Sequence, residues 1–349
     1  MYLVNQVYSF MYEHCMGVGS EKKVNQEKFR ATLTGVLDKT TLRVRGEDEL
    51  WALMWDKPIY ANQNANKATE IIDRCVAGHV FDDYKCIPGD SDGKTLAGLR
   101  APTEKLLRIR RLAKIFPRIH KLHNDAVGIL EDWDRKNCQD SRLENFDAIR
   151  NLIGVPPLKN SRGSIYGELH ELRGFGGITE LHMLMDFGFP VCKPDIWVAR
   201  TTQAYAEILA DRHKDALESF VRARYRKFEV ATLTQARLAQ HPEYAFAIID
   251  FLIRTQLDLQ DQLLSTHGID LQTRFRAHRF ADIVIAKFGM DPERAFGLVR
   301  APIDLLSSGA YYDRKLAGRH PILAKLANQI IAIKQQSSKA RKAPKTDVK

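Results

Sequence analysis

Apolar residues recur three and four positions apart along most of the chain, and runs that alternate apolar and polar residues are rare. This spacing is that of helices with one buried face, so the sequence predicts an all-α fold. One long helix is expected after Thr103, and Pro117 is expected to interrupt or end it because proline lacks the amide of the helical ladder. The buried side of this helix is expected to comprise Leu106, Ile109, Leu112 and Phe116.

Further helical patterns follow at 165–172 and 178–187, and several more amphipathic segments lie between 196 and 334. The polar residues 122–163, which include a Pro-Pro pair, look like an inserted helix-and-loop segment. No internal repeat is evident. The chain is therefore expected to be built from many helices of ordinary length.

The 349 residues carry a formal net charge of +10. Residues 334–349 contribute six cations and one acid, so half of the excess belongs to the body of the chain. Residues 335–349 are expected to form a disordered basic tail, because their Lys, Ser, Ala and Pro content is unsuited to a core. A basic body with a basic tail favours an anionic partner, and nucleic acid is the first candidate.

The five cysteines include no Cys-x-x-Cys pair, which argues against a zinc ribbon or a disulfide framework and fits a reducing compartment. No apolar run approaches the roughly 20 residues that span a bilayer, and the N-terminus lacks the pattern of a signal peptide. We therefore expect a cytoplasmic protein that makes no membrane contact.

The most informative segment is Leu172-Arg173-Gly174-Phe175-Gly176-Gly177, a glycine hairpin between two apolar helical patterns. Glycines there let backbone amides approach a phosphate, and the positive end of the following helix attracts an anion. Such contacts position a DNA backbone without reading its sequence. The same glycines could instead form only a helix connection with a glycine C-cap.

Asp195 lies 21 residues after Gly174, directly after a proline and before a helical pattern. Its simplest role is that of a helix N-cap. An ionised carboxylate at such a place could also stabilise the positive charge that forms on a sugar when its base departs. It could further orient or deprotonate the attacking water.

Taken together, these residues resemble the helix–hairpin–helix superfamily of DNA glycosylases, as an atypical member. Members typically show Leu-Pro-Gly-Val-Gly, an apolar helix and then Asp-x-x-Val-x-Arg. Here Leu172, Gly174 and Gly176 fall on the first element, and Asp195, Val198 and Arg200 fall on the last. A weaker match covers Leu50–Met54 and Asn66–Thr69, so the resemblance spans about residues 45–205.

The resemblance implies two helical subdomains that flank a DNA-binding cleft. One would comprise residues 45–189 and end in the helix–hairpin–helix at 166–187. The other would combine 1–44 with 190–334 and present the catalytic Asp195. The implied DNA contacts are Leu172, Arg173, Gly174, Gly176, Gly177, Ile178 and Arg200.

The resemblance also bears on cofactors. Members often hold a monovalent cation on hairpin carbonyls, here those of Leu172 and Gly174. No clustered cysteines follow Asp195, so neither an iron–sulfur cluster nor zinc is expected, and no cofactor is required.

Two departures from the family pattern matter. Bifunctional relatives carry a lysine that forms a Schiff base with the sugar, and Ile178 occupies that position here. We therefore expect base excision by water, without strand cleavage. Arg173 replaces the usual proline, which adds a phosphate contact or alters the turn.

Glycosylases extrude the target nucleotide and fill the vacated place with a wedge. Residues 57–63 fall where relatives carry this wedge, and Ile59, Tyr60 and Gln63 are its candidates. Large aromatic residues either line the pocket for the extruded base or belong to the helical core. The pocket candidates are Trp51, Trp55, Tyr166 and Trp197.

The leading hypothesis is a monomeric, monofunctional DNA glycosylase that acts on a damaged or modified base in double-stranded DNA. One alternative is a related enzyme that acts on bulky hypermodified or glucosylated bases of phage DNA, in antiviral defence or base processing. The insert at 122–163 and the long C-terminal helical region do not match small repair members of the superfamily, which is the reason to retain this alternative. The other alternative is a non-catalytic DNA-binding protein that retains only the hairpin.

Overall fold

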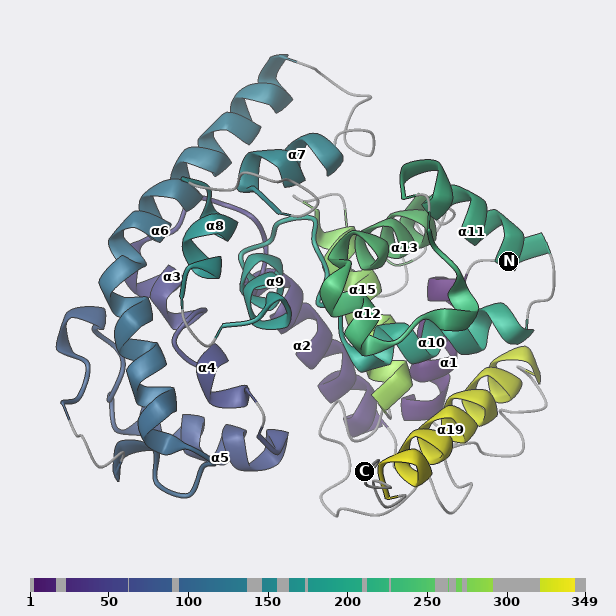
Figure 1. Cartoon of the computed structure of the whole chain (residues 1–349), viewed down its shortest axis with the longest axis horizontal. Coiled ribbons are helices and arrows are strands. Elements are labelled where there is room, and N and C mark those ends of the chain that lie inside the picture. Colours follow the sequence, from purple (N-terminus) through teal and green to yellow (C-terminus); the bar gives the residue numbers. More distant parts are fainter. Residues whose placement is uncertain are drawn as a thin grey trace, which may run out of the picture. The chain divides into compact units, whose positions relative to one another are not determined.

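The structure is a computed structural model, and it describes residues 3–16, 23–61, 63–89, 94–136, 146–155, 163–172, 175–208, 212–225, 227–254, 263, 268–271, 275–290 and 321–342. Of these residues 76% are helical and none belongs to a strand, which confirms the prediction of a mostly helical fold (Figure 1).

The chain divides into two compact units. Unit 1 comprises 1–38, 194–271 and 280–349, and unit 2 comprises 39–193 and 272–279. The sequence analysis placed the breaks near residues 45 and 189, whereas the structure has them at 38/39 and 193/194. The short segment 272–279 of unit 2 has no counterpart in that analysis.

Unit 2 is arranged along one long helix, α6, which packs against α3, α4, α7 and α8. Its described helices are α3 (Glu47–Ala52), α4 (Lys57–Tyr60), α5 (Ala65–Ala77), α6 (Pro102–Lys136), α7 (Phe146–Ile153), α8 (Ile165–His170) and α9 (Gly177–Asp186), with short 3-10 turns at Tyr84–Cys86 and Lys94–Leu96.

Helix α6 contains Pro117 in its interior, so the prediction that this proline interrupts or ends the helix was wrong. A proline inside a helix costs about 3 kcal/mol. Pro117 itself is exposed. The apolar face of α6 is almost fully buried both before and after Pro117 along the helix, so packing outweighs the lost hydrogen bond. The predicted buried side is confirmed at Leu106, Ile109, Leu112 and Phe116.

Unit 1 is organised around α10, which packs against α11, α12 and α19. Helix α1 packs against α15 through ring contacts of Tyr8 with Phe280 and of Phe10 with Phe288. The described helices are α1 (Leu3–Met16), α2 (Lys23–Lys39), α10 (Ile196–Ile208), α11 (Arg212–Arg224), α12 (Gln235–Gln240), α13 (Pro242–Arg254), α15 (Arg276–Met290) and α19 (Pro321–Lys342), with a 3-10 turn at Val230–Thr232. Residues 23–38 of α2 and 280–290 of α15 belong to unit 1.

Helix α19 continues to Lys342, so the expected disordered tail is wrong for residues 335–342. Gln, Lys, Ala and Arg propagate a helix well once it is nucleated, and the packed first turns of α19 provide that nucleus. Residues 343–349 lie outside the described part of the chain. None of the described helices is both long enough and apolar enough to cross a membrane.

Candidate functional site

The glycine hairpin joins α8 to α9 within unit 2. Ser164 caps α8, because its Oγ accepts a hydrogen bond of 3.1 Å from the amide of Gly167. After His170 the chain turns, and the Leu172 carbonyl accepts the amide of Phe175 at 3.1 Å. Arg173 and Gly174 lie outside the described residues.

Gly176 begins α9 with an extended backbone, and its carbonyl accepts the amides of Thr179 and Glu180. Gly176 has no side chain that could cap this helix start. Gly176 is exposed, and a Cβ built on it would meet nothing within 4 Å. The amides of Gly177 and Ile178, the first two of α9, have no acceptor among the residues that the structure describes, so they are open to an external anion, which the helix dipole would favour.

Beside the hairpin, a buried carboxylate faces an exposed histidine. Glu180, in the first turn of α9, is fully buried, and its two carboxylate oxygens lie 3.3 and 3.2 Å from Nδ1 of His170. The ring of Tyr166 stacks on that of His170 at 5.6 Å between centroids. Burial raises the pKa of Glu180, while His170 and Tyr166 oppose the shift.

The turn after α9 is fixed by a close backbone approach. Gly188 has φ +98°, and a Cβ there would lie 2.3 Å from the backbone nitrogen of Leu42. His123 of α6 packs edge-on against Phe187 and Phe189 on either side of this glycine. Burial lowers the pKa of His123 to about 4, so the ring is neutral at pH 7.

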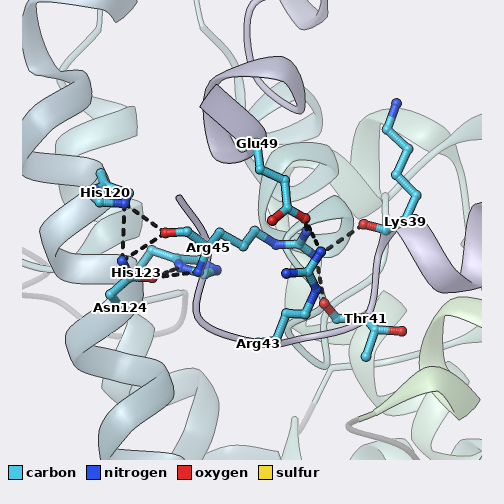
Figure 2. Close-up of polar contacts among 8 residues, drawn as sticks. All are labelled: Lys39, Thr41, Arg43, Arg45, Glu49, His120, His123 and Asn124. Atoms are coloured by element: carbon cyan, nitrogen blue, oxygen red, sulfur yellow. Dashed lines mark hydrogen bonds and ion pairs between the residues drawn. The ribbon is translucent and has the colours of Figure 1, made fainter. Parts of the chain in front are cut away.

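Figure 2 shows which contacts hold the segment 40–46, which contains Leu42 and has no regular secondary structure. The buried guanidinium of Arg45 donates to the carbonyl oxygens of Lys39 and Thr41 and pairs with Glu49. The backbone of Arg45 is held from α6, because its amide donates to Asn124 Oδ1 at 3.1 Å and its carbonyl accepts from Asn124 Nδ2 at 3.0 Å. His120 Nε2 donates to the same carbonyl at 2.8 Å.

The C-terminal end of α9 carries a second charged cluster, also within unit 2. Asp186 Oδ2 lies 2.9 Å from Lys57 Nζ, and Asp186 Oδ1 lies 2.9 Å from Arg279 Nη2 without the alignment of a hydrogen bond. Burial opposes both charges, but mutual attraction prevails: the pKa of Lys57 is raised and that of Asp186 is lowered. Burial lowers the pKa of the neighbouring His182, which stays neutral.

Asp195 belongs to unit 1, whereas the hairpin belongs to unit 2. The structure makes Asp195 the N-cap of α10, because its Oδ1 accepts the amides of Trp197 at 2.8 Å and Val198 at 3.1 Å. The residue is 8% exposed. Trp197 and Arg200 are half-buried and lie on the first turns of α10. The guanidinium of Arg200 lies over the ring of Trp197, 5.3 Å from its centroid.

Several wedge and pocket candidates lie in the core of unit 2 instead. Ile59 is fully buried, so it is not a wedge, which must project into the base stack. Trp51 is 1% exposed and donates through Nε1 to the Phe81 carbonyl, and Trp55 packs on the Phe81 ring. Both tryptophans are therefore core residues. Tyr166 is also buried, and its ring stacks on that of His170.

Tyr60 and Gln63 remain partly accessible. The hydroxyl of Tyr60 lies 3.2 Å from Oγ1 of Thr69, and Gln63 Oε1 accepts the amide of Arg100 at 2.9 Å. Lys105 of α6 holds this loop in place, because its ammonium group donates to the carbonyls of Pro58, Ile59 and Ala61. Burial lowers the pKa of Lys105 to about 8.

The monovalent cation implied by the family resemblance stays a prediction. Of its two expected ligands, only the Leu172 carbonyl is described, and that oxygen already accepts the Phe175 amide. The described residues also contain no group of three His, Cys, Asp or Glu side chains that could hold a metal ion.

Sequence reasoning missed the pairing of His170 with Glu180 and the support that Lys105 gives the loop. An acid in the first turn of a helix is common on any surface helix, so Glu180 carries no sequence signal of its burial. In the sequence Lys105 likewise belongs to a cationic helix face, and only the fold brings three carbonyls to it.

In comparisons with known proteins, no family model, no curated protein and no solved structure matches this chain. What the chain does must therefore be inferred from its own residues and their geometry.

Proposed function

We propose that the protein is a monofunctional DNA glycosylase. It would hydrolyse the N-glycosidic bond of a damaged or modified base that is extruded from double-stranded DNA, and leave an abasic site. The observation that carries the proposal is the uncapped start of α9 directly after the glycine hairpin, followed along the chain by Asp195 at the cap of α10.

Binding would begin at the hairpin. The amides of Gly177 and Ile178 have no acceptor among the described residues, so a phosphate oxygen is a suitable partner for them. The pair of His170 and Glu180 joins α8 to α9 and keeps the two sides of the hairpin in register. A rigid hairpin binds a phosphate at a lower entropic cost than a loose one.

Asp195 would act on the sugar. Two backbone amides bind its Oδ1, which fixes the orientation of the carboxylate. When the bond between C1′ and the base nitrogen breaks, its electron pair leaves with the base and positive charge forms at C1′. The carboxylate stabilises that charge, and a water molecule adds to C1′ and loses a proton.

The side chain of Ile178 is a reason to expect no strand cleavage. A lyase needs an amine that attacks C1′, and isoleucine offers none at this position.

The test is incubation of the protein with duplexes that each carry one damaged or modified base, followed by alkaline cleavage of abasic sites. The Asp195→Asn variant is expected to keep the cap, because asparagine caps helices well, and to lose about a hundredfold or more in rate. Asp83→Asn is the matched control, since Asp83 is also a capping carboxylate, on the 3-10 turn at Tyr84–Cys86.

Binding of duplex DNA without abasic sites on any substrate would favour the non-catalytic alternative. Equal rates for Asp195→Asn and the wild-type protein would remove Asp195 from the mechanism. A borohydride-trapped adduct with nicked DNA would contradict the monofunctional assignment.

A further inference from the structure

Helix α6 carries a long run of cations that contains no acid. Residues 105–124 include four arginines and three lysines but neither Asp nor Glu. Cations gain from the helix dipole only in the last turn, and this run begins in the first turn of a helix that spans Pro102–Lys136 and ends well before the last turn. The dipole therefore does not explain the run.

Two of the seven cations serve the fold of unit 2. Lys105 donates to three carbonyls, and Arg110 donates through Nε to the Pro88 carbonyl at 2.9 Å. The other five recur three or four residues apart, which places them along one side of the helix. We call these five the α6 stripe: Arg108, Arg111, Lys114, Arg118 and Lys121.

Three residues of the stripe, Arg108, Arg118 and Lys121, pair with carboxylates of unit 2. Arg108 pairs with Glu104, and Lys121 pairs with Asp125, both one turn away on the exposed surface. Exposed pairs of this kind contribute little. Lys114, in the middle, is exposed and makes no ion pair with any residue that the structure describes. Like charges at these spacings destabilise a helix, so the stripe favours an external anion.

One residue of the stripe contacts α8, the helix that ends at the hairpin. Arg118 Nη2 lies 2.9 Å from the carboxylate of Glu168, a buried residue of α8, and α8 ends at the hairpin. From Arg108 to Lys121 the helix rises about 20 Å. Along a duplex this length corresponds to roughly six phosphates of one strand. A regular row of phosphates therefore matches the stripe in sign, length and repetition.

We propose that the α6 stripe binds the phosphate backbone of the same duplex that the hairpin holds, so that the DNA interface extends along α6. This proposal rests on the proposed function. It adds a second, sequence-independent contact surface whose contribution is measurable apart from base excision.

The experiment compares two double variants that each remove two positive charges from unit 2. Lys114→Gln with Lys121→Gln neutralises the stripe, and Lys85→Gln with Lys94→Gln neutralises exposed lysines that lie off α6. Arg118 is left intact, because its removal would leave the buried Glu168 without its cation. Affinity for an undamaged duplex is measured across a salt series for each protein.

The stripe variant is expected to bind about tenfold more weakly than the wild-type protein at 0.15 M salt, and its log–log salt slope to fall by about 1.8, which is 0.9 for each lost phosphate contact. The control variant is expected to change the affinity and the salt slope by only a fraction of these amounts. Equal effects of the two variants would contradict DNA binding by the stripe but would not contradict the proposed function.

A wild-type protein that binds no duplex would overturn both proposals. Binding to vesicles of anionic lipid through Lys114 and Lys121, without binding to DNA, would also overturn the stripe as a DNA surface.

Discussion

The Nδ1 atom of His170 lies 3.2 Å from Oε2 of Glu180, so the last residue of α8 is joined to the first turn of α9 across the hairpin. The carboxylate is fully buried and the imidazole is mostly exposed. The hairpin is therefore stabilised by a side-chain pair as well as by its backbone turns.

The charge of Glu180 is predicted to destabilise the fold near neutral pH. Its pKa is raised above 4.5 chiefly by burial, so the folded state holds the proton more tightly than the unfolded state. Stability from this group is present below pH 4.5 and falls as pH rises through the folded pKa. The free energy of unfolding in urea should therefore be raised by Glu180→Gln, relative to the wild-type protein, more at pH 7 than at pH 4. A gain that is larger at pH 4 would contradict this.

His123 is predicted to make the protein sensitive to acid. Its pKa falls from 6.5 in the unfolded chain to about 4 in the fold, so the unfolded state binds the extra proton between these values. Stability is then lost as pH falls from 6.5 to 4, by about 3 kcal/mol at most. His123→Leu should flatten this part of the stability curve in thermal unfolding. Equal slopes for His123→Leu and the wild-type protein between pH 6.5 and 4 would contradict this.

Replacement of Gly188 is predicted to be strongly destabilising. Alanine there would adopt φ +98° and bring its Cβ within 2.3 Å of the Leu42 nitrogen, so the segment 40–46 would have to move. A loss of about 3 kcal/mol or more is expected in urea unfolding. Gly128→Ala, in α6 with open space around the added carbon, should instead gain about 0.5–1 kcal/mol. Equal effects at both sites would exclude the backbone contact as the cause.

Arg45 and Arg43 offer a matched comparison of a buried and an exposed guanidinium. Both pair with Glu49, but only the side chain of Arg45 is buried and bonds two carbonyls as well. Arg45→Lys should cost about 2 kcal/mol, because an ammonium cannot reproduce the planar fork. Arg43→Lys should cost less than about 0.5 kcal/mol. Similar losses in chemical unfolding would show that the carbonyl contacts contribute little.

Local patterns predicted the helical class and the buried side of α6, because the spacing of Leu106, Ile109 and Leu112 is a property of the helix itself. They misjudged Pro117, whose effect depends on how well the residues around it pack. Ile59 was misjudged for a similar reason, since loop position alone does not report burial. The pairing of His170 with Glu180 follows from how α8 packs on α9, which no single segment of sequence encodes.

The buried charge cluster at Asp186 is assembled from distant parts of the chain. Lys57 and Asp186 are made early during synthesis, whereas Arg279 belongs to the separate segment 272–279 that returns to unit 2. A nascent chain that has emerged only as far as residue 193 would thus hold Asp186 with Lys57 but without its second cation. At about 5–20 residues per second, the ribosome needs several more seconds to deliver Arg279. Unit 2 would therefore acquire its final stability only after much of the other unit has already been translated.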